Sequence, residues 1–440
     1  MLQTSIIALS RGSLVFMARR RPEMTFLGGH WGFVGGRVAD DDHSHSDPFL
    51  ACALRETFEE TGVVADAEAL RLIGDWRNPD WAPFRYHSRF YELQLGAEAE
   101  PEINHEFDDS CWIRPADALT MWARGEWLLS DPIRAVLEHL DGAENAWPQF
   151  SAGTHFSDNQ IFPGVWLLSV RSKTIPAGMH TPGLEHEPMA LGLRTNTIVL
   201  EGDSLFVIDP GSDSPDDHQR LNAFIRSTGK AVEAVILTHH HPDHVQGLEA
   251  LRQEFPAEVW AHTHTLDELG LQGRALENLE FTVGGNRWAI HPTPGHAQGH
   301  LILHSPTLNT IICGDMMASV GTILISPQDG NMADYLQSLE SMKGLSPKTI
   351  IPSHGWPFPD AQARIQHYID HRLRREQKIV NAMNSTPQSL DELLAVAYAD
   401  TPRSVWPLAR LSLEAHLDFL VEKRVAKVEN GFFVLALADA

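Results

Sequence analysis

Cysteine is scarce, and Cys52, Cys111 and Cys313 are the only three in 440 residues. They are odd in number and widely spaced, so they form neither a disulfide framework nor a CxxC metal site. Disulfide-rich secreted domains are therefore excluded, and a reducing compartment is the simplest interpretation.

Long apolar runs are also missing. No stretch is long enough to cross a bilayer, and the N-terminal MLQTSIIALSRGSLVFMARRRP places its arginines after the apolar residues, the reverse of a secretory signal. We expect a soluble, cytoplasmic protein with no membrane partner.

Positive charge is in deficit, because 34 Lys and Arg face 58 Asp and Glu, for a formal charge of −24. This argues against broad electrostatic binding to nucleic acid or anionic lipid, although it leaves room for a local basic groove.

The length and the 43% hydrophobic content allow more than one core, and about three domains are expected. Changes in pattern predict a mixed strand and helix domain at 1–141 and a polar linker at 142–163. An α/β layered domain follows at 164–384, and helices with a terminal hairpin occupy 385–440.

Three short segments carry the strand predictions in the second half of the chain. TNTIVLEGDSLFVIDPG predicts a hairpin around Gly202 and Asp203, and VAKVENGFFVLAL predicts another that turns at Asn430 and Gly431. Between them, AVEAVILT predicts a buried strand that runs directly into a histidine-rich loop.

That loop, THHHPDHVQG at 238–247, has the spacing H-x-H-x-D-H. Alternate residues can face one point and the last two a second point nearby, so two metal ions are implied. Further candidates each follow an apolar run in a small-residue loop. The seven candidate ligands are His239, His241, Asp243, His244, His296, Asp315 and His354. Nitrogen and carboxylate ligands of this kind suit zinc, with manganese or iron as alternatives.

In this order of ligands, residues 164 to 360 resemble the metallo-β-lactamase superfamily, whose fold is an αββα sandwich. The resemblance implies that His239, His241 and His296 hold one ion and that Asp243, His244 and His354 hold the other. Asp315 would bridge them, and Asp243 and Asp315 would be catalytic as well as metal-binding. His240 should point away, and His300 should support a ligand rather than be one. The alternative, that these histidines only pack or cap, requires the whole ordered set to arise by accident.

The downstream motifs GTILISPQDGNMADYLQSLESM and YIDHRLRREQKIV, with TPGLEHEPMALGLRTNTIVLEGDSLFVIDPG before them, resemble a lactamase-beta-like subgroup that includes a mitochondrial endoribonuclease. Residues 386 to 440 resemble its winged helix. The basic residues of this segment are offset by acidic ones, so a structural or dimerising lid is favoured over a nucleic-acid reader. The basic set is Arg410, Lys423, Arg424 and Lys427, and the acidic set is Glu414, Asp418, Glu422 and Glu429.

DPFLACALRETFEETG predicts a helix that Asp47 caps, that starts at Pro48 and that stops at Gly62. Within it, three carboxylates at i, i+3 and i+4 share one face, an arrangement that favours Mg²⁺ or Mn²⁺. The carboxylates are those of Glu56, Glu59 and Glu60.

Together with Arg55 and Gly62, these glutamates resemble the Nudix box, and residues 1 to about 140 resemble that family's α/β/α sandwich. The resemblance implies that Glu59 and Glu60 are catalytic. Two departures stand out: the insertion ADDDHSHSD lengthens the spacing from Gly36 to Arg55, and Asp47 stands where the first Glu belongs. MTFLGGHWGFVGG resembles a subgroup that acts on coenzyme A-like diphosphates, although the coenzyme A signature is not evident. A solvated acidic face, or an inactive domain kept as a binding module, are the alternatives.

The sequence thus predicts a multidomain α/β and α+β hydrolase for small-molecule substrates. A binuclear centre would cleave an ester, thioester or lactone by metal-bound hydroxide, and a Mg²⁺-dependent Nudix domain would act on a nucleoside diphosphate-linked substrate. The alternatives are a single-stranded RNA endoribonuclease whose Nudix domain only binds, and a non-catalytic metal-dependent scaffold. A homodimer fits either enzyme.

Overall fold

The computed structural model describes residues 1–24, 26–78, 85–143, 159–171 and 194–436. The chain divides into two compact units, Met1–Leu167 and Leu168–Ala440. The predicted multidomain class, with mixed sheets and helices, is confirmed. Most of the predicted linker and the segment TPGLEHEPMALGL lie outside the described residues, and the predicted domain boundaries stay predictions.

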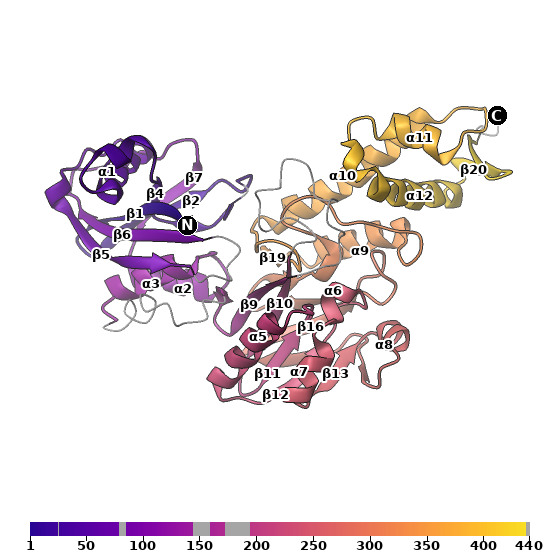
Figure 1. The fold of residues 1–440 in the computed structure, drawn as a ribbon, viewed down its shortest axis with the longest axis horizontal. Helices are drawn as coiled ribbons and strands as arrows, with labels where there is room; N and C mark the ends of the chain where they lie inside the picture. Colours follow the sequence, from indigo (N-terminus) through magenta and orange to yellow (C-terminus); the bar gives the residue numbers. More distant parts are fainter. Residues whose placement is uncertain (25, 79–84, 144–158, 172–193, 437–440) are drawn as a thin grey trace. The chain divides into compact units, whose positions relative to one another are not determined.

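The first unit is built on one sheet in the order β3-β2-β1-β6-β5, with β4 pairing β1 and β7 pairing β2. Only β1 and β6 pair in parallel among the pairs of this sheet that the structure describes. Helix α1 lies on one side of the sheet, and α2 and α3 lie on the other (Figure 1). The elements are β1 (Leu2–Arg11), β2 (Leu14–Arg20), β3 (Trp31–Gly32), β4 (Val34–Arg37), η1 (Asp41–Ser44), α1 (Pro48–Thr61), η2 (Ala67–Ala69), β5 (Leu70–Arg77), β6 (Tyr86–Gln94), β7 (Phe107–Ile113), α2 (Pro115–Ala123), α3 (Asp131–Leu140) and β8 (Asn159–Phe162).

The ends of α1 follow the predicted signals. The carboxylate of Asp47 accepts the backbone N–H of Phe49 and of Leu50, and Pro48 is the first helical residue. Gly62 ends the helix in the left-handed conformation at φ 69°, which glycine adopts without steric cost. Both predicted helix ends are confirmed.

The second unit contains two sheets, and the strands of one of them that lie wholly or partly in this unit follow the order β14-β13-β12-β11-β10-β9. The other has the order β15-β16-β17-β18-β19. The elements up to the second sheet are β9 (Val165–Arg171), β10 (Arg194–Glu201), β11 (Leu205–Ile208), α5 (Pro215–Thr228), β12 (Val232–Ile236), α6 (Pro242–Val245), α7 (Leu248–Glu254), β13 (Glu258–Ala261), α8 (Thr263–Leu269) and β14 (Arg274–Ala275). The predicted hairpin at Gly202 and the buried strand before the histidine loop are both confirmed.

The segments between the strands of the second sheet carry candidate metal ligands. The C-terminal helices of the chain follow this sheet. The elements are β15 (Glu280–Val283), β16 (Asn286–Pro292), β17 (Leu301–Ser305), β18 (Thr310–Ile312), η3 (Gly314–Met316), α9 (Met332–Gly344), β19 (Thr349–Ile351), α10 (Ala361–Ala382), α11 (Leu390–Ala397), η4 (Arg403–Val405), α12 (Trp406–Glu422), β20 (Ala426–Glu429) and β21 (Phe432–Leu435). β20 and β21 form the predicted hairpin at Asn430 and Gly431. No helix in the described part of the chain is both long and apolar enough to span a membrane.

A buried histidine lies on α12 where it faces α10. His416 is 1% exposed, and neither of its ring nitrogens has a hydrogen-bond partner among the described residues. Burial, with the nearby cations Arg372 and Arg375 and the ring of His371, lowers the pKa of His416 to about 3. The ring is therefore neutral in the folded protein at neutral pH.

This burial makes the packing of α12 on α10 sensitive to acid. Below about pH 6.5, His416 binds a proton in the unfolded chain but not in the folded chain. The free energy of unfolding therefore falls as the pH drops. The loss should approach 1.4 kcal/mol for each pH unit, as an order of magnitude. Urea unfolding of wild type and His416→Leu between pH 7 and 5 measures it. The variant should show a shallower pH slope, and His367→Leu, at an exposed position of α10, should keep the wild-type slope. Equal slopes for wild type and His416→Leu would contradict the assignment.

Candidate metal centre

The seven predicted ligands come from loops that follow strands of both sheets in the second unit. The loop after β12 and the short helix α6 that follows it carry the 239–244 group, the loop after β16 carries His296, and β18 and β19 are followed by Asp315 and His354. Backbone hydrogen bonds join these loops: the Leu301 N–H donates to the Thr238 carbonyl at 2.8 Å. The structure therefore brings together residues that are more than a hundred positions apart.

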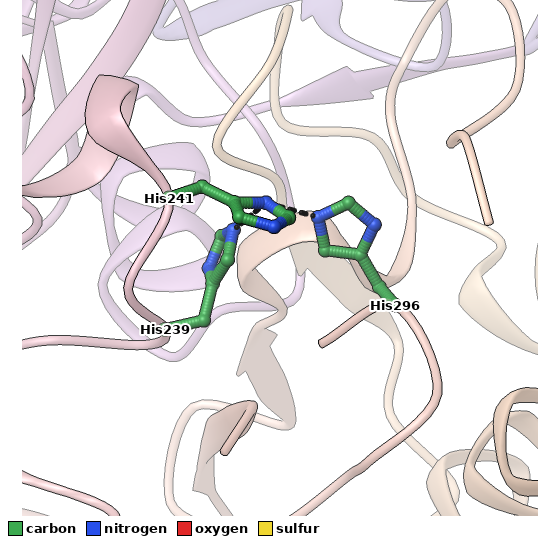
Figure 2. Close-up of side chains that lie close together, drawn as sticks. All are labelled: His239, His241 and His296. Atoms are coloured by element: carbon green, nitrogen blue, oxygen red, sulfur yellow. Dashed lines mark hydrogen bonds between the residues drawn. The ribbon is translucent and has the colours of Figure 1, made fainter. Parts of the chain in front are cut away.

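His239, His241 and His296 form the first cluster, and Figure 2 shows their rings converging. Nε2 of His239 and Nε2 of His296 lie 3.0 and 2.9 Å from Nδ1 of His241. Two nitrogens bound to one tetrahedral zinc lie roughly 3.3 Å apart. The spacing therefore fits three nitrogens that share one small cation.

The outward nitrogen of each ring has its own hydrogen-bond partner. His296 Nδ1 donates to the Leu324 carbonyl at 2.8 Å, and His241 Nε2 donates to Asp329 at 3.0 Å. Thr238 Oγ1 is 2.6 Å from an Asp209 carboxylate oxygen, to which it donates, so it can accept from His239 Nδ1 at 3.0 Å. Because the proton sits on the outward nitrogen, each inward nitrogen presents a lone pair, as metal-binding histidines require.

Asp243, His244 and His354 form the second cluster, and all three are buried. Nε2 of His354 is 3.4 Å from Oδ2 of Asp243, and Nε2 of His244 is 3.8 Å from Oδ1. Here too the outward nitrogens are held: His354 Nδ1 donates to the Arg194 carbonyl at 2.9 Å, and His244 Nδ1 donates to Asp209 at 2.9 Å.

Asp315 lies between the clusters. Its Oδ2 is 3.5 Å from Nε2 of His296, and its Oδ1 is 3.5 Å from Nε2 of His244 and 3.4 Å from Nε2 of His354. Oδ1 of Asp315 and Nε2 of His244 are buried without a hydrogen-bond partner among the described residues. Unpartnered buried atoms of this kind are costly unless an ion fills the space between them.

His300 holds the backbone at Asp315 in place. His300 Nε2 accepts the Asp315 N–H at 3.0 Å, and His300 Nδ1 donates to Thr293 at 2.9 Å. Gly314 precedes it at φ 51°, and a Cβ there would lie 2.5 Å from the His300 ring. His300 thus orients Asp315 and belongs to neither cluster, as its predicted supporting role requires.

Asp209 is a site residue that the sequence reasoning missed. It is 1% exposed, and its carboxylate accepts from the N–H of Thr238 at 2.7 Å as well as from the side chains of Thr238 and His244. Its φ of 49° is unusual for a residue other than glycine. The signal was an aspartate directly after the apolar run LFVI, in the hairpin segment.

The electrostatics of the two clusters differ. Burial lowers the pKa of His296 to about 4 and that of His239 well below its usual value, so both rings are neutral. For His354, burial opposes protonation, yet the carboxylates of Asp315 and Asp243 raise the pKa to about 10. Buried carboxylates at this end of the site therefore demand positive charge, which protons supply here and divalent cations would supply better.

His240 belongs to neither cluster. Its Nε2 lies 3.4 Å from Asp329, which also accepts from His241, so it lies at the outer side of the first cluster.

The predicted carboxylates of the first unit are only partly assembled. Glu60 is buried, and its Oε2 accepts the Gly35 N–H at 2.6 Å. Nη1 of Arg55 donates to Glu56 at 2.8 Å and to Glu59 at 3.0 Å. Among the described residues, the carboxylate oxygens of these three glutamates do not all lie within 4.8 Å of one another. The three glutamates therefore come from one helix, as predicted, but their carboxylates are not arranged as a preformed metal site.

Glu56 and Glu60 both face β4, where a Cβ on Gly36 would lie 2.3 Å from the Glu56 carboxylate. Burial raises the pKa of Glu60 to about 8 although the Gly35 N–H opposes this rise, and the charges of Glu56 and Glu106 raise it further. Glu106 is thus a fourth carboxylate near this face, which the sequence reasoning did not name.

The insertion supplies contacts that hold this helix. Asp42 pairs with Arg55 through two bonds, from Nε at 3.2 Å and from Nη2 at 2.9 Å. Asp47, at the position of the missing first Glu, caps α1 and pairs with Arg89 at 3.0 Å. These aspartates therefore hold α1 and Arg55 in place.

Three family models match the chain. Residues 191–354 match the metallo-beta-lactamase superfamily, residues 2–131 match the NUDIX domain, and residues 389–431 match the beta-lactamase associated winged helix domain.

Individual relatives agree with these matches. The beta-lactamase-like protein 2 homolog of Drosophila melanogaster is 30% identical over 271 residues, which cover 56% of this chain and 90% of that protein. An atrochrysone carboxyl ACP thioesterase of Aspergillus chevalieri is 28% identical over 195 residues, 44% of this chain and 62% of that protein. A crystal structure of a beta-lactamase domain protein from Burkholderia ambifaria is similar in fold, with a TM-score of 0.53 and 19% identity, and the match covers 63% of this chain and 93% of that one.

The order of the ligands, their convergence on two adjoining clusters and these matches together show that the chain is a hydrolase of the metallo-beta-lactamase superfamily that also carries a NUDIX domain and an associated winged helix domain.

Proposed function

We propose that the second unit hydrolyses a small ester, thioester or lactone at a centre of two metal ions, with zinc as the ion that the donor set favours. The observation that carries the proposal is Asp315, whose two oxygens face two separate clusters of lone pairs. His239, His241 and His296 would hold one ion, and Asp243, His244 and His354 the other. Two such ions, when bound, lower the pKa of a shared water and polarise the bond that it attacks.

The residues around the centre fix its geometry. Asp209 and Asp329 hold the outward nitrogens of His244 and His241, so these rings cannot rotate away from the centre. His300 fixes the backbone of Asp315, the residue that both ions would share. The chain itself would therefore supply orientation and negative charge, which we propose as the roles of Asp243 and Asp315 in catalysis.

Small substrates are favoured over RNA by the charges of the winged helix. Arg410 pairs with Asp391 and Glu414, and Lys423 pairs with Glu376, so these two cations are already neutralised. A polyanion bound over many phosphates needs a continuous basic track. The thioesterase among the relatives also supports thioester hydrolysis. The homodimer predicted from the winged helix stays a prediction.

For the first unit we propose Mg²⁺-dependent cleavage of a nucleoside diphosphate-linked substrate. A substrate with a coenzyme A-like group would fit the subgroup that MTFLGGHWGFVGG resembles. Glu56, Glu59 and Glu60 would hold the ion once Arg55 releases the first two. The buried carboxylate of Glu60 and the half-buried carboxylate of Glu56 support this, because a cation would offset both the burial and the repulsion between them.

Metal content is the first test. Because the second unit buries carboxylates and lone pairs that favour cations, protein purified without chelator should contain about two transition-metal ions per chain. Elemental analysis measures this directly. Less than about half an ion per chain after growth in metal-replete medium would overturn the binuclear proposal.

Turnover of the second unit is the next test. Asp315→Asn keeps the size of the side chain and removes its charge, so hydrolysis of the best ester, thioester or lactone in a panel should fall by roughly 100-fold or more. Asp370→Asn, at an exposed position of α10, should match the wild type. Cleavage of single-stranded RNA by the wild type, with affinity that falls steeply as salt rises and with loss of activity in Asp315→Asn, would replace this proposal by the ribonuclease.

The first unit has an independent test. Glu59→Gln should abolish Mg²⁺-dependent release of a nucleotide or phosphopantetheine product and leave hydrolysis by the second unit intact, because the two activities lie in separate compact units. Glu68→Gln, an exposed change in η2, is the control. A wild type that binds such diphosphates but cuts none of them, with either Mg²⁺ or Mn²⁺, would point to a binding module.

A further inference from the structure

The segment 318–331, which we call the site loop, connects the strand end that carries Asp315 to helix α9. It supplies hydrogen-bond acceptors to two rings of the first cluster. The Leu324 carbonyl accepts from His296 at 2.8 Å, and the Asp329 carboxylate accepts from His241 at 3.0 Å. The orientation of these two rings therefore depends on where the site loop lies.

Helix α10 holds the site loop through its side chains. Arg372, which is 3% exposed, donates Nη2 to the Ile323 carbonyl, one residue before Leu324. Tyr368 accepts the Ala318 N–H at 3.0 Å, and Arg364 donates to the Ser319 carbonyl at 2.8 Å. Side chains on three successive turns of α10 therefore hold the first half of the site loop through hydrogen bonds.

Arg372 is itself held by its surroundings. Its guanidinium lies 5.3 Å from the ring centroid of Tyr335, whose hydroxyl donates to the Met316 carbonyl at 2.7 Å. On the loop side, Ile323 and Ile325 belong to a buried apolar cluster that includes Ala415 of α12. The winged-helix segment therefore packs into the same core as the site loop.

Further polar contacts join this segment to α10 and to the end of the site loop. Arg375, one turn after Arg372, donates to the carbonyl of Ala397, the last residue of α11, and to Asp400 beyond it. Asn331, the last residue of the site loop, donates to Glu422 of α12 at 3.5 Å. The C-terminal helices therefore support both the helix that grips the loop and the loop itself.

The second cluster does not use the site loop in this way. The outward nitrogen of His244 donates to Asp209 and that of His354 donates to the Arg194 carbonyl, and both acceptors lie at or beside strands of the first sheet. The site loop does meet the backbone of His354, because the Ser319 N–H donates to the His354 carbonyl at 3.1 Å. A shift of the loop at Leu324 and Asp329 would therefore disturb the rings of His241 and His296, whereas the rings of His244 and His354 would keep their own acceptors.

We propose that Arg372 is a positioning residue of the metal centre that acts on the ion of the first cluster alone, through the site loop and the Leu324 carbonyl. The winged-helix segment, by packing on α10, is then part of the support of this ion rather than a separate module. The inference rests on the proposed binuclear centre.

The test is metal release from the cobalt-loaded full-length protein, followed by the visible spectrum while a competing chelator is titrated. Arg372→Lys keeps the charge and loses the planar fork, so one of the two ions should bind about tenfold or more weakly and the other should be unchanged. Arg374→Lys, an exposed change two positions along α10, should release both ions as the wild type does.

Double variants identify the ion that is affected. With His354→Ala, which removes a ligand of the second cluster, Arg372→Lys should still weaken the remaining ion. With His296→Ala it should have no further effect, because the ring on which Arg372 acts is gone. Tyr368→Phe, which removes the hydroxyl contacts to the loop and keeps the ring, should weaken the same ion in the same direction and gives the test if Arg372→Lys fails to fold.

Wild-type protein that holds two ions, with both or neither weakened in Arg372→Lys and Tyr368→Phe, would overturn the inference and leave the binuclear centre standing. Wild-type protein that takes up fewer than two cobalt ions per chain at saturation would overturn the proposed centre and the inference with it.

Discussion

The second unit depends on the concentration of negative charge and lone pairs at a point that water barely reaches. Asp209, Asp243 and Asp315 are buried beside His244 and His354, and the rings of the first cluster adjoin them. Without compensation, such a group would cost several kcal/mol for each charge. Each loop that meets there ends a strand, and each ring has a hydrogen bond on its outward side. The two sheets therefore serve as a rigid frame that keeps mutually repelling groups close together.

The sequence could predict the groups that face the centre because their chemistry shows in short motifs. The H-x-H-x-D-H spacing after an apolar strand named four of the candidate residues, and aspartate or histidine in small-residue loops named the others. Asp47 and Gly62, the ends of α1, were equally legible since helix ends have local signals. Here the information lies within a few positions of the residue that it concerns.

The hydrogen-bond partners that orient these groups could not be predicted from short motifs. Asp209 meets His244 across 35 positions, and Asp329 meets His241 across 88. The Leu324 and Arg194 acceptors are backbone carbonyls, which every residue possesses and which therefore leave no trace in a sequence. In the first unit, helical periodicity placed Glu56, Glu59 and Glu60 on one helix, but it could not show that Arg55 bridges two of them while Glu60 turns to Gly35.

The spread of the histidine and aspartate loops along the chain also bears on biosynthesis. His239 leaves the ribosome 115 positions before His354, an interval on the order of ten seconds at ordinary rates of translation. During that time the nascent chain offers an incomplete set of ligands, because His354 has not yet been made. α10 and α12 emerge later still. An ion captured early would meet an unfinished site, so correct loading belongs to the period after the C-terminal helices have been made.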